Sequence, residues 1–398
     1  MTASEQLAQF AAGSKALPKL CREYKKERAT VHLEELVGGA LSFYAAAAVA
    51  KTGGVHIFVA EDRDAAAYLL NDFYNLLDEK QVYFFPSSYK RSAAYGAEDA
   101  QGVVQRTTAM NAVRGFTKGY LVVCTYPEAL AERVVDAATL QRDTIAVKLG
   151  DKISIAVLED ALADANFTRV DFVYEPGQYS VRGGIVDVFS YSESKPYRID
   201  FFGDEVDSIR RFNISSQLSA DKLDRVEIVP NLNAGEAPRV SFVQFAGSSA
   251  TCWFYDADYV LRRVNDLRRK VLADMEEPGQ IDRLLTSRNV LLRDMAGNSV
   301  VALRDNLPER PATAAVVFDT APQPKFNKNF EMLADDMIRN SLRGYATYIL
   351  SENKVQVERL ENIFHQIGRG QAAVRSLSVT LHEGFVDNDL KLCLYTDH

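Results

Sequence analysis

The sequence predicts an α/β protein of several domains: a parallel α/β domain, a β-rich α+β module inserted into it, and a further small α/β domain. The 398 residues, 47% of them hydrophobic, exceed the roughly 250–300 residues at which a single core stops growing. Strand and helix patterns alternate from about residue 31 to 130, and short alternating strands with turn residues replace them between 169 and 212. We therefore divide the chain into 1–138 and 231–310 as the two parts of the first domain, 139–230 as the module, and 311–398 as the last domain.

The first domain is predicted from strands at 55–60, 82–85 and 121–125 and helices at 41–51, 62–77 and 98–113. Gly53-Gly54 closes the first helix, because glycine readily adopts the left-handed conformation of a helix end. Asp62 caps the next helix. This alternation of strands and helices is typical of a parallel sheet covered by helices.

A helix at 151–166 precedes the module, whose turns at Glu175-Pro176-Gly177 and Gly203-Asp204 predict three or four short antiparallel strands. A long helix follows at 256–275. Prolines then mark a linker or domain edge, at positions 308, 311, 322 and 324. Beyond them the pattern predicts helices at 330–342 and 354–367 and strands at 345–350, near 374–381 and at 390–395.

The composition excludes several classes of protein. A net charge of −8 argues against a chain that coats nucleic acid unaided, because phosphate neutralisation requires clustered basic residues. The cysteines lie more than a hundred residues apart without a zinc or redox pair, at positions 21, 124, 252 and 393. The richest apolar run, 41–50, is too short to span a bilayer. We expect a cytoplasmic protein that binds no membrane and no metal.

The module carries a combination of motifs that resembles a known family. The motifs are Arg169-Val170-Asp171, Gly177-Gln178-Tyr179, the run 181–189 reading VRGGIVDVF, and the run 198–205 reading RIDFFGDE. Together they closely resemble the second domain that the excinuclease subunit UvrB shares with bacterial transcription-repair coupling factors (Mfd). The resemblance implies that the module binds the excinuclease subunit UvrA, and that the first domain is a degenerate RecA/helicase-like domain.

The turn after the first strand should hold phosphates in such a domain, through the pattern GxxxxGK[ST]. Gly38 and Gly39 are present and Ser42 follows, but no lysine stands beside it. Lys51 is the next lysine, and the helical rise places it roughly 15 Å from the loop amides. The strand at 121–126 also lacks a following Asp-Glu pair for magnesium. We therefore expect these glycines to cap or pack a turn and not to bind a nucleotide.

This loss distinguishes the two kinds of relative. UvrB has an intact phosphate loop and a long hairpin that separates DNA strands, whereas the matching interval 87–100 is only fourteen residues long here. The coupling factors are therefore the closer match. The resemblance implies a non-catalytic front part of a longer protein, whose ATP- and magnesium-dependent DNA translocase and RNA polymerase contacts lie beyond residue 398.

Two arginines are the main candidates for partner binding. Arg169 and Arg182 lie on predicted strands joined through the 175–177 turn, and they can be neighbours if those strands pair. The residues alone leave open whether they form an interface or ion pairs with Asp171, Glu175 or Asp187; the resemblance implies the UvrA interface. Weaker candidates are Gln178, Tyr179 and Phe189. A bulge at Gly183-Gly184 would place Phe189 on the same face as Arg182.

Two other interpretations remain open from the sequence. The chain could be a UvrB-like, nucleotide-dependent DNA-binding or helicase fragment, or its first domain could be an autoinhibitory or structural unit that masks the arginine surface in the full-length protein. C-terminal domains beyond this chain could also mask that surface. The helix at 256–275 also carries a basic stripe, which could face DNA or another domain. Internal ion pairs on a solvated helix are the simpler explanation of that stripe.

Overall fold

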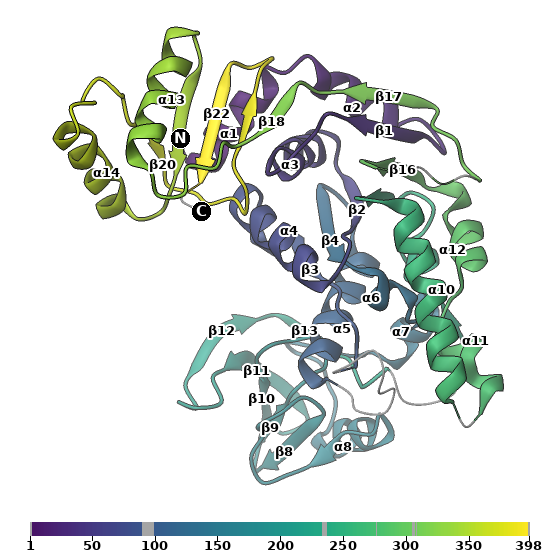
Figure 1. The fold of residues 1–398 in the computed structure, drawn as a ribbon. Helices are drawn as coiled ribbons and strands as arrows, with labels where there is room; N and C mark the ends of the chain where they lie inside the picture. Colours follow the sequence, from purple (N-terminus) through teal and green to yellow (C-terminus); the bar gives the residue numbers. More distant parts are fainter. Residues whose placement is uncertain are drawn as a thin grey trace.

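The computed structural model describes residues 2–89, 99–232, 237–275, 277–304, 307 and 309–396. Most of the interval 87–100, where the short replacement for the UvrB hairpin was predicted, lies outside the described residues. Figure 1 shows three parts: a central sheet flanked by helices, the β module below it, and the small domain beside the N-terminal helices.

The central sheet is parallel throughout and has seven strands, in the order β17-β1-β16-β15-β2-β4-β3. The strands come from both sides of the module: β1 (Thr30–Glu34), β2 (Gly54–Val59), β3 (Val82–Phe84), β4 (Tyr120–Thr125), β15 (Thr251–Phe254), β16 (Ser299–Ala302) and β17 (Ala314–Val317). The module is therefore an insertion between β4 and β15. The sheet extends past the predicted boundary at 310, because β17 pairs with β1.

Helices cover both faces of this sheet, because alternate strand residues point to opposite sides. Ile57 and Val59 pack toward the helices α5 (Ala100–Gly115), α6 (Pro127–Ala131), α10 (Ala257–Asp274) and α12 (Arg288–Asp294). Phe58 packs on the other side, toward α1 (Ala3–Ala12), α2 (Ala16–Tyr24) and α3 (Ala40–Thr52). The two cores explain why the strands are apolar along their whole length.

The predicted helix ends in the first domain are confirmed by local geometry. The Asp62 side chain accepts a hydrogen bond from the Ala65 amide at the start of α4 (Arg63–Leu76). Gly53 ends α3 at φ +63°. The remaining helices of the central part are short: α7 (Ala137–Asp143), α9 (Phe242–Ala246) and α11 (Ile281–Leu284). A small pair of strands, β5 (Val134–Val135) and β14 (Arg239–Val240), joins the chain on either side of the module.

The module contains a six-stranded sheet: four antiparallel strands within 169–212, as predicted, with one further strand at each edge. Its order is β12-β11-β10-β9-β8-β7, with the bounds β7 (Thr168–Arg169), β8 (Gln178–Arg182), β9 (Ile185–Val188), β10 (Tyr197–Phe202), β11 (Glu205–Phe212) and β12 (Ser219–Leu223). The turn at Gly203-Asp204 joins β10 to β11 as predicted. The strands β7 and β8 on either side of the 175–177 turn are parallel, not antiparallel.

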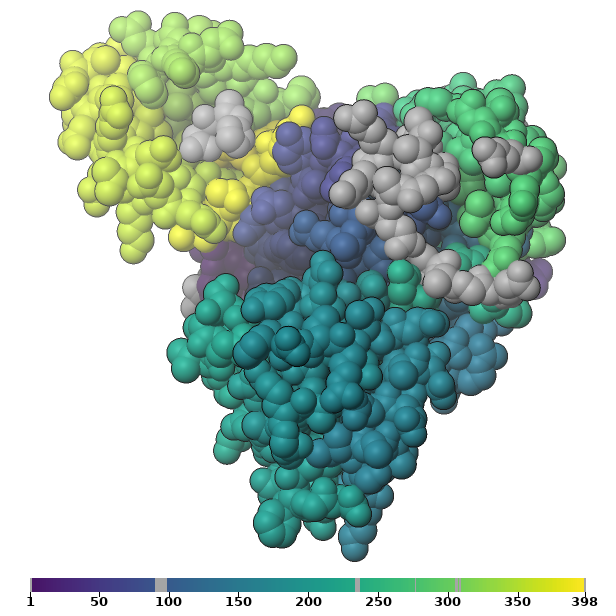
Figure 2. Space-filling view, turned by 90° about the horizontal axis from the view of Figure 1, so that it is seen from below, coloured from purple at the N-terminus to yellow at the C-terminus, as the bar shows by residue number. Residues whose placement is uncertain are grey.

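One face of the module sheet is covered and the other is left open. Helix α8 (Ile155–Asp164) and the antiparallel pair β6 (Ile145–Lys148) and β13 (Arg225–Ile228) enclose a core with Leu158, Val186 and Ile199. The module core is separate from the two cores of the central sheet. Figure 2 shows the module as a distinct lobe in teal.

The last domain has a five-stranded mixed sheet in the order β18-β21-β22-β19-β20. Its elements are β18 (Thr320–Pro322), α13 (Phe330–Leu342), β19 (Ala346–Leu350), α14 (Lys354–Gln366), β20 (Ser376–Leu377), β21 (Phe385–Asp387) and β22 (Leu392–Thr396). The predicted helices are confirmed, but Pro322 lies in a strand and not in a linker. Phe385 and Leu394 join the same core as Phe43 of α3, so this domain packs firmly on the central one.

Candidate functional site

The open face of the module sheet is organised around Asp187. Backbone pairing aligns Ser180, Asp187, Arg198 and Arg210 across the strands β8 to β11. The Asp187 side chain is only 2% exposed, and it accepts hydrogen bonds from Arg198 Nε at 2.7 Å and Arg182 Nη2 at 2.6 Å. A second bond, from Arg198 Nη2, measures 2.8 Å. The buried carboxylate thus holds two guanidinium groups in fixed positions on the sheet surface.

Arg182 is the more accessible of these two arginines, with 38% of its side chain exposed. Its guanidinium lies 4.7 Å from the ring centroid of Phe172, which is itself 48% exposed. Tyr174 projects from the same loop and is also exposed. A rigid guanidinium beside exposed aromatic rings combines flat apolar area with several donors, a combination that is enriched at protein interfaces.

The Gln178 side chain holds the loop that carries Phe172 and Tyr174 in position. Its side-chain oxygen accepts hydrogen bonds from the backbone amides of Tyr174 and Glu175, at 2.9 and 3.2 Å, and its amide nitrogen donates to the Glu175 carboxylate at 3.0 Å. These bonds satisfy loop donors that no strand partner reaches. Gln178 therefore acts on the surface through the loop that carries Phe172 and Tyr174.

Arg169 lies on the other face of the sheet from Arg182. Residues opposite each other on paired strands share a face, and Arg169 is paired with Tyr179, whose ring lies in the core beside α8. Arg169 Nη1 contacts Glu159 of α8 at 2.8 Å. Arg182, three residues after Tyr179, points the opposite way. The strands do pair, but the expectation that the two arginines are neighbours is wrong because of this register.

Tyr179 and Phe189 are core residues in this structure. Each is only 5% exposed, so neither ring offers apolar surface to a partner here. Gly183 and Gly184 form the turn between β8 and β9, with Arg182 opposite Ile185, and not a bulge. This turn, like the expected bulge, places Phe189 on the same face of the sheet as Arg182. Gly183 has φ +61°, which this tight turn requires.

Sequence reasoning missed Phe172, Tyr174 and Arg198 as surface residues. The sequence did contain a signal for Phe172 and Tyr174. Apolar residues occupy both odd and even positions from Val170 to Tyr174, and alternate residues point to opposite sides, so some of them must face outward. Val173 is buried and its two neighbours are exposed. The placement of Arg198 depends on its pairing with Asp187 across the sheet, which no local pattern indicates.

The loop with Gly38 and Gly39 lies between β1 and α3, and residues 383–384 of the last domain pack against it. A Cβ atom on Gly39 would overlap the carbonyl oxygen of Glu383, and one on Gly38 would lie 2.9 Å from the carbonyl oxygen of Gly384. Both carbonyl groups therefore lie directly against the backbone of the loop. Lys51 lies in the last turn of α3, at the far end of the helix from this loop.

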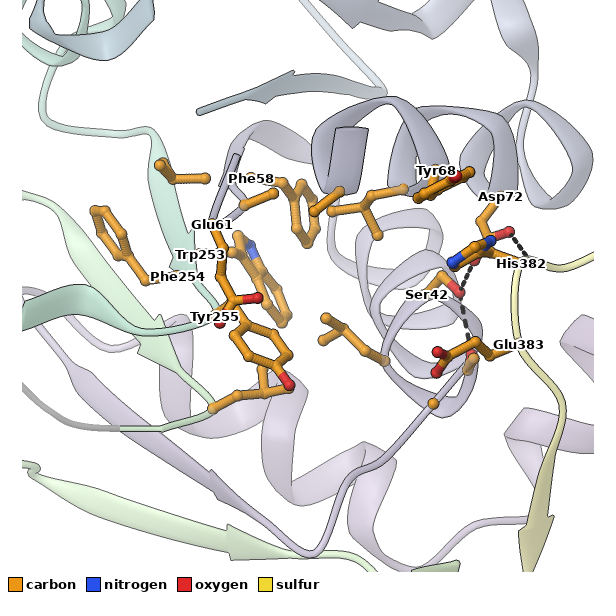
Figure 3. A pocket seen from close by; sticks show the side chains of 18 residues that line it. Ser42, Phe58, Glu61, Tyr68, Asp72, Trp253, Phe254, Tyr255, His382 and Glu383 are labelled. Atoms are coloured by element: carbon orange, nitrogen blue, oxygen red, sulfur yellow. Dashed lines mark hydrogen bonds between the residues drawn. The ribbon is translucent and has the colours of Figure 1, made fainter. Parts of the chain in front are cut away.

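A buried carboxylate ties the two domains together at this point, as Figure 3 shows. Asp72 accepts hydrogen bonds from the Ser42 hydroxyl at 2.6 Å and from the His382 backbone amide at 2.7 Å. Burial raises the pKa of Asp72 to about 6, although both hydrogen bonds act in the opposite direction. The His382 ring stacks on Tyr68 with centroids 3.6 Å apart. Ser42 therefore takes part in an interdomain contact.

Other candidate chemistry finds no support in the part of the chain that the structure describes. No group of three or more His, Cys, Asp or Glu residues there is arranged to hold a metal ion. The four cysteines are buried free thiols. No described helix is long and apolar enough to cross a membrane. Two arginines of the basic stripe of α10 form ion pairs within the helix, as the simpler explanation predicted: Arg262 with Asp258 at 2.9 Å and Arg269 with Asp266 at 2.5 Å. Arg263 instead contacts Glu128 of α6 at 2.8 Å.

Comparison with known proteins supports the resemblance noted in the sequence. Residues 145–233 match the family model of the UvrB interaction domain. The chain is 27% identical over 199 residues to the transcription-repair-coupling factors of Bacillus subtilis and Escherichia coli, which is 50% of this chain and 17% of each relative. The factor from Haemophilus influenzae is 35% identical over 101 residues, 25% of this chain and 9% of that protein. The matches thus span less than a fifth of these relatives.

Proposed function

We propose that this chain is the non-catalytic amino-terminal portion of a transcription-repair coupling factor, and that its module recruits UvrA to stalled transcription complexes for nucleotide excision repair. The observation that carries the proposal is that the family match and the arginine surface lie in the same segment of the chain. The segment that matches the UvrB interaction domain, 145–233, contains the open sheet face on which Asp187 fixes Arg182 and Arg198. A fixed cationic surface of this kind favours specific recognition of a protein partner.

Arg182 and Phe172 form the centre of the proposed UvrA surface. Their stacked contact keeps an accessible guanidinium in one orientation, so little conformational entropy is lost on binding. Arg169 contributes to UvrA binding from the α8 side of the module. Gln178 contributes indirectly, by holding the loop that carries Phe172. Tyr179 and Phe189 support the sheet from within the protein.

The closed loop supports a non-catalytic role for the first domain, which we propose to be a degenerate RecA/helicase-like domain. The backbone carbonyl of Glu383 lies against Gly39, where an ATP phosphate would need donors. In this proposal the ATP-dependent translocase and the contacts with RNA polymerase and DNA belong to further parts of a longer protein.

The competing function is a UvrB-like, nucleotide-dependent DNA enzyme, and two calorimetric titrations separate it from the proposal. The 398-residue chain is titrated with UvrA in one experiment and with ATP and magnesium in the other. The proposal expects a saturable UvrA isotherm that weakens with salt and no ATP isotherm at micromolar concentrations. Stoichiometric micromolar ATP binding without UvrA binding would favour the competing function.

A further inference from the structure

Helix α2 carries a stripe of basic residues that the proposed function does not use. Residues 15–28 include six lysines and arginines and two glutamates, a net charge of +4, in a chain whose net charge is −8. The apolar side of the helix packs on α3, β1 and β17, with Leu17, Leu20 and Tyr24 in the core (Figure 1). The basic side chains are left on the outer surface of the molecule.

The stripe follows the spacing of an α-helix. Lys15, Lys19, Arg22 and Lys26 are three or four residues apart, so they lie above one another on one face, and Lys25 adjoins them at the helix end. All five are exposed, and the side chains of Lys15 and Arg22 are 90% and 66% exposed. We call these five residues the α2 stripe.

Lys51, in the last turn of α3, extends the α2 stripe. The Tyr24 hydroxyl lies 2.5 Å from the Thr52 hydroxyl, and this contact joins the ends of the two helices. Lys25 follows Tyr24 and Lys51 precedes Thr52, so the two lysines lie at the same end of the central domain. Burial raises the pKa of the neighbouring Cys21 thiol, and the charges of Lys51 and Lys25 act on it in the opposite direction.

Carboxylates neutralise only part of this basic surface. Three of its members form ion pairs: Arg22 and Lys26 with Glu23, and Lys15 with Asp389 at 3.3 Å. Within the ranges that the structure describes, the other three have no ion pair and no side-chain hydrogen bond: Lys19, Lys25 and Lys51. These three lysines give the surface an uncompensated positive charge.

We propose that the α2 stripe and Lys51 bind the phosphate backbone of duplex DNA without sequence specificity. Lysine is a compact charge on a flexible stem, which neutralises phosphates but does not read base edges in the way that a fixed fork does. The nine residues of α2 span about 14 Å, and a duplex carries about eight charges over that length. This contact is separate from the module, and it adds to the DNA contacts proposed for further parts of the protein.

The surroundings of the stripe disfavour other anionic partners. None of the exposed large hydrophobic side chains in the described part of the chain lies within residues 15–52. Single-stranded nucleic acids bind by stacking on aromatic side chains, and protein interfaces are enriched in aromatic residues and depleted of lysine. Helices that bind membrane surfaces insert an apolar face, whereas α2 buries its apolar face in the core. Duplex DNA is the polyanion that this surface fits best.

The test is a fluorescence anisotropy titration of a short fluorescein-labelled DNA duplex with the 398-residue chain. A variant that combines Lys19→Gln, Lys25→Gln and Lys51→Gln should bind the duplex about tenfold more weakly at about 50 mM salt. The slope of log affinity against log salt concentration should decrease by about 2.7, since each lost phosphate contact contributes about 0.9. Melting temperatures verify that the variant is folded.

The matched control combines Lys195→Gln, Lys222→Gln and Lys354→Gln, which removes the same charge from exposed positions of the module and the last domain. It should bind the duplex like the wild type. Single-stranded DNA of the same length and vesicles containing phosphatidylserine are titrated in parallel. The proposal would be overturned by an absence of saturable duplex binding, by unchanged affinity and slope in the folded α2 variant, by an equal loss in the control, or by tighter binding of single strands or vesicles than of the duplex.

Discussion

Asp187 and Arg198 face each other in register on β9 and β10, and two hydrogen bonds of 2.7 and 2.8 Å join the carboxylate to the guanidinium. Arg182 approaches the same carboxylate from the neighbouring strand. The hydrogen bonds to Asp187 raise the pKa of Arg198 above its ordinary value. The module surface is thus a preorganised charge pattern, and its shape depends on one buried aspartate.

Replacing this aspartate should destabilise the module. Asp187→Ala leaves two guanidinium groups without their shared partner, and we expect a loss of about 2–3 kcal/mol in the free energy of unfolding, discounted because Arg182 is partly exposed. Urea unfolding monitored by circular dichroism measures the change. Asp221→Ala is the control, since that carboxylate is 68% exposed and lies 3.8 Å from Arg211. Equal stability of both variants would contradict the role of Asp187.

A methyl group on Gly39 should disturb the contact between the central and last domains. The added Cβ of Gly39→Ala overlaps the Glu383 carbonyl oxygen, so the segment around His382 must move. Hydrogen exchange at the His382 amide should become faster, because its bond to Asp72 is weakened. Gly115→Ala is the control, with no atom within 4 Å of its added Cβ. Unchanged protection of His382 in the Gly39 variant would show that the loop does not hold this segment.

Asp72 should make stability depend on pH. Burial raises its pKa to about 6 in the folded protein, above the ordinary value of 3.8, so the folded state binds the proton more tightly than the unfolded state does. The stability from this group is greatest below about pH 4 and decreases as the pH rises through 6. Asp72→Asn removes the titration and should gain about 1–3 kcal/mol relative to wild type between pH 4 and 7. A constant difference across this range would contradict the buried, titrating carboxylate.

Removing Gln178 should loosen the aromatic loop without unfolding the sheet. Gln178→Ala deletes the acceptor of the Tyr174 and Glu175 amides, so both amides should exchange faster with solvent. Gln217→Ala, which removes a different surface amide of the module, leaves this loop intact and serves as the control. The two amides are followed by hydrogen exchange with nuclear magnetic resonance. Exchange rates unaffected by Gln178→Ala would mean that other contacts hold the loop.

Local patterns predicted the elements of this protein better than the arrangement of its surfaces. Helix ends such as Asp62 and turns such as Gly203-Asp204 depend on a few adjacent residues, and they were predicted correctly. Arg169 and Arg182 were wrongly predicted to be neighbours, because the face that each occupies depends on the parallel register of β7 with β8. Sequence could not indicate that Glu383 fills the loop at Gly39, because these residues are brought together only by packing of two domains.

The measurement that tests the proposed function most directly is the affinity of UvrA for the chain with Arg169→Glu and Arg182→Glu combined, recorded together with the melting temperature. Arg225→Glu is the control, because Arg225 is exposed on β13, which pairs with β6 and not with the strands that carry Arg169 and Arg182. The proposed interface predicts a folded double variant with at least about a thirtyfold loss in UvrA affinity, equivalent to about 2 kcal/mol. It also predicts near wild-type binding by the control. Unaltered UvrA binding by the well-folded double variant would contradict the proposal.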